Sequence, residues 1–124
     1  MTALETLVWT AVCRLDDLAV ERGAAALLGA DQVALFRLVD GRVLAVQQHD
    51  PFSDAYVISR GIVGSRHVDD AEVPTVASPM YKQVFDLTTG RCLDGAGKRP
   101  ARDLRPDLRT WPVRVRDGLV EVGS

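Results

Sequence analysis

Four residues of this sequence have side chains that bind metals well: Cys13, His49, His67 and Cys92. Two cysteines and two histidines are the ligand set of a tetrahedral zinc site, and also of a His₂Cys₂ iron–sulfur cluster. Structural zinc sites usually draw their ligands in close pairs along the chain, such as C-x₂₋₄-C or H-x₃₋₅-H. No two of the four candidates lie within four residues of each other. The spacing therefore predicts two free thiols and no metal centre.

Catalytic motifs are equally hard to find. The sequence has no G-x-S-x-G motif, and neighbouring residues such as His49 and Asp50 point in opposite directions on an extended chain. Gly61 and Gly64 do not form the G-x-G-x-x-G pattern of a dinucleotide site. The acidic residues at 69–72 do not have the alternating spacing of an EF-hand loop. We therefore predict no catalytic residue and no cofactor bound by this chain.

The bulk composition is that of one small globular domain. The chain has 124 residues, of which 47% are hydrophobic and 26% charged, with a formal net charge of −2. No apolar run approaches the ~18–20 residues that span a bilayer, and the first residues lack the positive charge of a secretory signal. These features predict a cytoplasmic protein that binds neither nucleic acid nor membrane.

Positive charge is concentrated near the C-terminus. Residues 98–116 contain two acidic side chains, Asp103 and Asp107, against seven basic ones. The seven are Lys98, Arg99, Arg102, Arg105, Arg109, Arg114 and Arg116. A solvated basic face is one interpretation, and a docking surface for an acidic partner is the other, because arginine is enriched at interfaces. Nucleic acid is disfavoured, since Trp111 is the single aromatic residue in the segment.

Turn signals predict the hairpins that must position these residues. Asp40-Gly41 between two apolar runs is typical of a two-residue type I′ turn. It predicts a hairpin over residues 32–46, with Leu38 opposite Val43.

Asp117-Gly118 predicts a second hairpin, over residues 111–122, in which Val115 pairs with Val120 on an inward apolar face. Residues 82–93 read as a third hairpin with a turn at Thr88-Thr89-Gly90.

The remaining segments give weaker signals. Residues 14–18 favour a single helical turn, and residues 15–29 have an undecided helical period. Residues 47–97 are richer in Pro, Gly, Ser and Asp, and residues 94–110 read as a long loop. We expect an all-β fold, a small antiparallel sandwich or partly open barrel with an inserted loop region.

Two segments carry a resemblance that covers nearly the whole chain. They are DPFSDAYVISRGIVG at residues 50–64 and SPMYKQVFDLTTGRCL at residues 78–93. Together they resemble the two cluster-binding loops of Rieske-type ferredoxin domains, and more closely the small subunits of cytoplasmic assimilatory NAD(P)H-dependent nitrite reductases. The resemblance implies a single Rieske-like domain over residues 1–124, with residues 47–97 as its cluster-binding-type subdomain.

The sequence departs from that family pattern at the ligands themselves. A Rieske cluster takes one Cys and one His from each loop. Those positions fall at Asp50 and Phe52 in the first loop, and at Ser78 and Tyr81 in the second. None of the four residues supplies a thiolate or an imidazole, and we expect the two aromatic rings to fill the vacated space. The resemblance therefore implies a Rieske-like domain that has lost its cluster.

The resemblance also implies a function. It indicates a non-catalytic small subunit that supports a large subunit carrying FAD, an iron–sulfur cluster and sirohaem in the reduction of nitrite to ammonium. From charge and expected exposure, we predict that the partner contacts are Arg60, Lys82, Arg102, Arg105 and Arg109. One alternative is a Rieske-type [2Fe–2S] electron-transfer ferredoxin, which the missing ligands disfavour. Another is a free-standing module that binds a small molecule between the two loops.

Overall fold

A computed structural model describes residues 7–124 of the chain. Thirteen strands and three short 3₁₀ helices account for the regular structure of these residues. The strands are β1 (Trp9–Arg14), β2 (Gly23–Leu28), β3 (Asp31–Arg37), β4 (Val43–Gln47), β5 (His49–Asp50), β6 (Ala55–Tyr56), β7 (Ile62–Val68), β8 (Ala71–Ala77), β9 (Val84–Asp86), β10 (Cys92–Asp94), β11 (Thr110–Trp111), β12 (Val113–Arg116) and β13 (Leu119–Gly123). The helices are η2 (Leu15–Asp17), η3 (Ile58–Arg60) and η4 (Ala101–Asp103).

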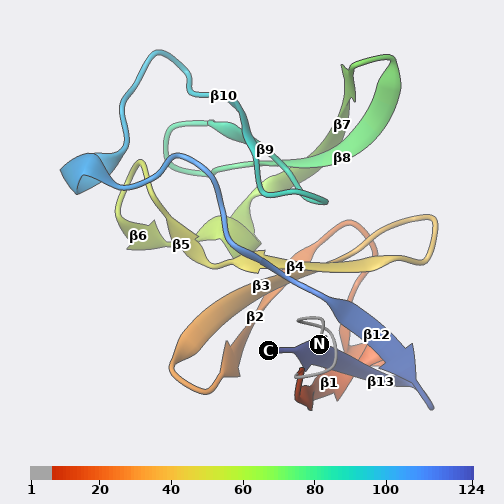
Figure 1. Cartoon of the computed structure of the whole chain (residues 1–124). Coiled ribbons are helices and arrows are strands. Elements are labelled where there is room, and N and C mark those ends of the chain that lie inside the picture. Colours follow the sequence, from red (N-terminus) through yellow and green to blue (C-terminus); the bar gives the residue numbers. More distant parts are fainter. Residues whose placement is uncertain (1–6) are drawn as a thin grey trace.

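Three antiparallel sheets form successive layers (Figure 1). The middle sheet has the order β11-β4-β3-β2, and it lies between a sheet of order β10-β9-β8-β7 and one of order β1-β13-β12. A fourth, two-stranded sheet joins β5 to β6. No sheet of the described chain closes into a barrel, so the all-β prediction is confirmed in its sandwich form. The elements β5 to β10 all fall within the stretch 47–97.

The middle sheet is buried on both faces, and this produces two cores. Strand β3 alternates between them, because successive side chains of a strand point to opposite faces. Ala34 and Phe36 pack toward β8 and β9, where Phe85 is fully buried, and this cluster is the upper core, under the upper sheet β10-β9-β8-β7. Val33 and Leu35 pack toward β13 in the lower core. This double burial explains why β3 reads as a continuous apolar run rather than as an alternating one.

The C-terminal hairpin is confirmed from Val113 onward, whereas Trp111, expected in the same hairpin, lies in β11 and pairs with Ala45 of β4. Val115 pairs with Val120 and Val113 with Val122, and the turn residues Asp117 and Gly118 both have positive φ, as a type I′ turn requires. Burial is uneven across the pair, however. Val120 is fully buried in the lower core, whereas Val115 on the edge strand β12 is 41% exposed.

The predicted register of the first hairpin is wrong. Leu38 donates its backbone N–H to the carbonyl oxygen of Arg42 at 2.8 Å, and Arg37 is the residue that faces Val43. Of the two turn residues, only Gly41 has positive φ, at +95°. The loop therefore has three residues between Leu38 and Arg42, which is the three-residue hairpin that ends in a left-handed glycine rather than a type I′ turn.

Two further strand regions were not predicted. Residues 23–28, left undecided between helix and strand, form β2, which pairs with β3 from Gly23–Phe36 to Leu28–Asp31. Strands β7 and β8 form a hairpin that projects from the upper sheet (Figure 1). The acidic residues Asp69 and Asp70 form its turn, and both have positive φ. The helical turn expected at residues 14–18 is confirmed as η2, and no helix among the described residues is long and apolar enough to cross a membrane.

Candidate functional site

The first loop is organised around the carboxylate of Asp50. This residue ends β5 and is fully buried, which is costly for a charged group unless hydrogen bonds compensate. Its Oδ1 accepts hydrogen bonds from the backbone N–H of Phe52 at 2.8 Å and of Ser53 at 3.4 Å. The carbonyl oxygen of Asp50 also accepts from the N–H of Asp54 at 2.8 Å. Asp50 therefore closes the tight turn between β5 and β6.

The second loop turns around Ser78 in a similar way. Ser78 follows β8 and is 1% exposed. Its backbone N–H donates to the carbonyl oxygen of Gln83 at 2.9 Å, and its carbonyl oxygen accepts from Lys82 at 3.1 Å. Its Oγ accepts from the N–H of Met80 at 3.2 Å. These bonds fold residues 78–83 into a compact turn, with Lys82 in the left-handed region at φ +63°.

A hydrogen bond joins the two loops. The hydroxyl of Ser78 donates to Oδ2 of Asp50 at 2.5 Å, across 28 positions of sequence. A hydroxyl bound to a carboxylate makes a short, charge-assisted hydrogen bond. Asp50 and Ser78 are the positions at which the family resemblance implies one Rieske ligand from each loop. The structure thus brings these two positions into direct contact. We call the two joined loops, the first around Asp50 and the second around Ser78, the tip of the domain.

The two aromatic positions have different environments. Phe52 is 7% exposed and joins the upper core, with its ring 6.1 Å from that of Phe85. Tyr81 is 44% exposed, and its ring lies beneath the ammonium group of Lys98, 4.7 Å from the ring centroid. Phe52 therefore packs inward as expected. The expected inward packing of Tyr81 is wrong, because the compact turn at residues 78–83 presents it to solvent.

The residues of this tip do not fit a [2Fe–2S] cluster. Cys13 packs against the lower core from β1, and His67 is exposed on β7. Cys92 packs at the edge of the upper core, and burial raises the pKa of its thiol, as it does for Cys13. Among residues 7–124, no group of three or more His, Cys, Asp or Glu side chains could hold a metal ion.

His49 has a partner that the sequence reasoning did not find. Its Nε2 hydrogen-bonds Oδ1 of Asp54 at 2.7 Å, rather than pairing with Asp50. Arg102 of η4 binds both oxygens of Asp54, through Nε and Nη2 at 2.8 Å each. The Arg102 guanidinium and the His49 imidazole hold the pKa of the Asp54 carboxyl well below its ordinary value. This cluster ties the long loop to the first loop, across 48 positions that no local pattern connects.

The rest of the long loop is fixed against β4 and against the turn between β9 and β10. The N–H of Arg109 donates to Oε1 of Gln47 at 2.7 Å, and the N–H of Gln47 donates to the carbonyl oxygen of Arg109 at 2.8 Å. Leu108 donates its N–H to the carbonyl oxygen of Gly90 at 2.7 Å. A Cβ on Gly90 would lie 1.9 Å from the oxygen of Leu108, so only glycine allows this approach.

The five basic residues predicted to contact a partner are not all in one place. Arg105 and Arg109 line one groove, and Arg102 lies beside it in its pair with Asp54. Arg60 is exposed in η3, and Lys82 is exposed in the second loop. Neither Arg60 nor Lys82 lines that groove.

The fold and the tip define a class of protein. The sequence model of the Rieske-like [2Fe-2S] domain family matches residues 8–123. A crystal structure of a NADH-dependent nitrite reductase small subunit from Mycobacterium tuberculosis superposes with a TM-score of 0.79 at 43% identity, covering 95% of this chain and 96% of that one. The chain is thus a Rieske-like domain.

Comparison with whole proteins narrows the class. The chain is 36% identical over 115 residues to the nitrite reductase (NADH) small subunit of Escherichia coli K12, covering 92% of this chain and 95% of that protein. It is 40% identical over 122 residues to the nitrite reductase [NAD(P)H] large subunit of Klebsiella oxytoca, of which it spans 11%. The chain belongs to the family of nitrite reductase small subunits.

Proposed function

We propose that this chain binds the large subunit of an NAD(P)H-dependent nitrite reductase and supports its reduction of nitrite to ammonium, without carrying electrons itself. The observation that carries the proposal is the bond between Asp50 and Ser78, within a chain that matches small subunits over almost their full length. A hydrogen bond joins the two loops, and a hydrogen bond neither accepts nor donates electrons. What remains for the tip and its surroundings is recognition.

The similarity to the Klebsiella oxytoca protein supports association with a large subunit. There, a segment resembling this chain over 122 residues lies within a polypeptide named as the large subunit. A domain that is fused to a subunit in one protein and separate in another is expected to bind that subunit when separate. In our proposal the large subunit holds the FAD, the iron–sulfur cluster and the sirohaem, and this chain holds none of them.

Contacts and location complete the proposal. We propose Arg60, Lys82, Arg102, Arg105 and Arg109 as contact residues, on the basis of their charge and exposure. We propose a cytoplasmic location, and the two cysteines support it because both are free thiols.

The test combines binding with activity. The chain and the large subunit of the same organism are purified separately, mixed and analysed by size-exclusion chromatography. Nitrite-dependent NAD(P)H oxidation is then measured with and without the chain. The proposal expects co-elution and a faster rate with the chain present. Separate elution with an unchanged rate would overturn it.

The same preparation tests the electron-transfer alternative. A [2Fe–2S] protein purified in air is brown and absorbs visible light. We expect the purified chain to be colourless and to contain no stoichiometric iron. A visible spectrum with two irons per chain would replace our proposal with the ferredoxin alternative.

A further inference from the structure

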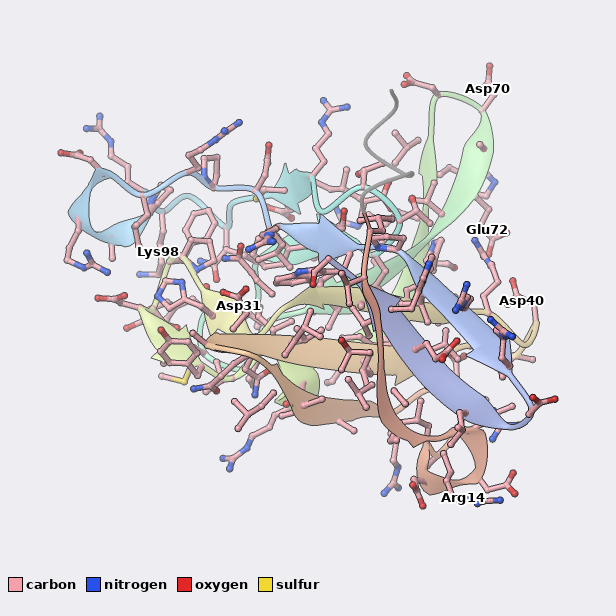
Figure 2. The ribbon with its side chains drawn as sticks, turned by 60° about the horizontal axis from the view of Figure 1, so that its bottom comes forward. Arg14, Asp31, Asp40, Asp70, Glu72 and Lys98 are labelled. Carbon is pink, nitrogen blue, oxygen red and sulfur yellow. The ribbon has the colours of Figure 1, made fainter. Side chains whose placement is uncertain are left out.

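A groove of about 790 Å³ runs beside the long loop, and its lining includes His49 and Pro51, the two chain neighbours of Asp50. Residues 30–32, 47–56 and 104–111 contribute its walls. Figure 2 shows Asp31, which lines the groove, at the same end of the molecule as Lys98, and away from Arg14 and Asp40. The groove therefore occupies one end of the layered sheets.

The walls of the groove are preformed. The paired hydrogen bonds between Gln47 and Arg109 and the bond from Leu108 to Gly90 fix the basic wall against the sheet. Ala101 donates its N–H to the carbonyl oxygen of Pro51 at 2.8 Å, upstream of the groove-lining part of the loop. A surface that is already ordered loses little conformational entropy when a partner binds.

The side chains of the groove are those that dominate interfaces. Tyr56 is 56% exposed, and its ring lies edge-on to the His49 imidazole with 5.1 Å between centroids. Trp111 lies at the base of the groove and is 7% exposed, and the guanidinium carbon of Arg109 lies 4.4 Å from its ring centroid. Tyr, Trp and Arg supply most of the binding energy in typical interfaces.

The charge of the basic wall is not fully neutralised within the chain. Residues 98–109 contain five basic side chains and two acidic ones, and of these Arg105, Arg109 and Asp107 line the groove itself. Within the groove, Asp31 lies 3.4 Å from Arg109, and Asp107 accepts a hydrogen bond from the N–H of Cys92 at 2.9 Å. Arg105 is exposed and forms no ion pair with any residue between 7 and 124. It is therefore available to a carboxylate from outside.

We propose that this groove binds an extended, acidic segment of the large subunit, with a carboxylate on Arg105 and apolar atoms on the exposed ring of Tyr56. The inference rests on the proposed function, because it names the part of the partner that the chain recognises. Arginine binds carboxylates through two parallel hydrogen bonds, which fixes their orientation. Tyr56, Arg105 and Arg109 line the groove as exposed side chains, whereas small-molecule sites enclose most of their ligand. A polypeptide, covered by the rest of its own subunit, suits such a groove.

Charge reversal tests the proposal. Arg105→Glu is compared with Arg116→Glu, which reverses an equally exposed arginine on β12, outside the groove. Binding to the large subunit is measured by isothermal titration calorimetry at low and physiological salt. Arg105→Glu is expected to raise Kd roughly 10-fold or more, and Arg116→Glu less than about 2-fold. Circular dichroism and thermal melting check that both variants are folded.

The outcomes separate the two proposals. If the wild-type chain does not bind the large subunit, the proposed function fails and the groove proposal falls with it. If the wild type binds and Arg105→Glu binds as tightly as Arg116→Glu, the groove proposal alone is overturned.

A photo-crosslink identifies the occupant. Tyr56→p-benzoylphenylalanine places the crosslinker in the groove, and Val39→p-benzoylphenylalanine is the control at a turn residue that is 76% exposed. We expect Tyr56 to crosslink to a large-subunit peptide rich in Asp and Glu, and Val39 to give no such product. Crosslinking to a peptide without acidic residues would overturn the proposal.

A small-molecule occupant is the remaining outcome. The Trp9→Phe variant leaves Trp111 as the single tryptophan and thus as a fluorescence reporter in the groove. We expect NADH, titrated into this variant alone, to leave its fluorescence unchanged after inner-filter correction. Saturable quenching by micromolar NADH would show a nucleotide site in the groove and overturn the peptide proposal.

Discussion

Replacing Ser78 with alanine should destabilise the protein more than its size suggests. The substitution removes little volume but two interactions at once: the donor to Oδ2 of Asp50 and the acceptor for the N–H of Met80. Within residues 7–124, the Ser78 hydroxyl is the single hydrogen-bond donor to Oδ2 of Asp50, since the two backbone donors reach Oδ1. Because Asp50 is fully buried, bulk water does not reach this oxygen in the native loops.

The magnitude follows from that count. A hydrogen bond to a charged group contributes about 1.5–3 kcal/mol, and a buried charged acceptor that loses its donor reaches the upper part of this range. We expect Ser78→Ala to lower the free energy of unfolding by about 2–3 kcal/mol. For a domain of this size that corresponds to a fall in Tm of roughly 6–12 °C.

Urea denaturation and thermal melting measure the effect. Ser65→Ala is the matched control, because Ser65 is exposed on β7 and its hydroxyl makes no hydrogen bond to any residue from 7 to 124. The control should change the free energy of unfolding by less than about 0.5 kcal/mol. If Ser78→Ala loses no more stability than Ser65→Ala, the bond between the loops does not hold them together, and our reasoning about the tip is refuted.

Three further predictions concern other parts of the chain. Gly90→Ala should lower the free energy of unfolding by about 2 kcal/mol or more, because its Cβ would lie 1.9 Å from a backbone oxygen. Gly97→Ala is the control: its Cβ would have open space, and it should lower the free energy of unfolding by about 1 kcal/mol. Urea denaturation measures both. The pKa of Asp54 is lower in the folded chain than in the unfolded chain, so its carboxylate stabilises the fold above about pH 4, and this contribution is lost as pH falls toward the lowered pKa. Asp54→Asn should therefore make Tm fall less steeply between pH 4 and 2. An unchanged dependence of Tm on pH in this range would contradict the prediction. Burial raises the pKa of Cys13 and Cys92, so iodoacetamide at pH 8 should alkylate both several-fold more slowly than a cysteine peptide, and equal rates measured by mass spectrometry would contradict it.

Local turn chemistry made part of the fold predictable. Asp117-Gly118 gave the correct register because both residues adopt the left-handed conformation that a type I′ turn needs. Asp40-Gly41 has the same letters but a different conformation, with positive φ at the glycine alone. The dipeptide fits two hairpin geometries, and the packing of the flanking strands selects between them.

Other elements depend on contacts that are distant in sequence. The alanines of β2 favour helix intrinsically, but pairing along the whole of β3 overrides that weak preference. Gly23 has no room for a side chain, because a Cβ there would lie 2.2 Å from the carbonyl oxygen of Ser59. The strand is thus specified by β3 and η3, which a local window does not include.

The candidate site also has parts that the sequence predicts and parts that depend on contacts distant in sequence. The family resemblance located Asp50 and Ser78, but the bond between them spans 28 positions and no local pattern connects them. The walls of the groove depend on still longer separations, 62 positions between Gln47 and Arg109. The sequence shows that basic residues cluster along residues 98–116. It does not show that Arg105 and Arg109 line the same groove as Tyr56.

The bond between Asp50 and Ser78 also determines what the tip requires from the cell. Its two loops are joined by a hydrogen bond between side chains of the chain itself, so the tip can fold as soon as the chain has been synthesised. A hydrogen bond forms without iron, a sulfide donor or a scaffold protein, and neither chelators nor superoxide act on it. A recognition surface built on it would keep its shape in iron starvation and oxidative stress, when metal-bearing subunits are the ones that fail.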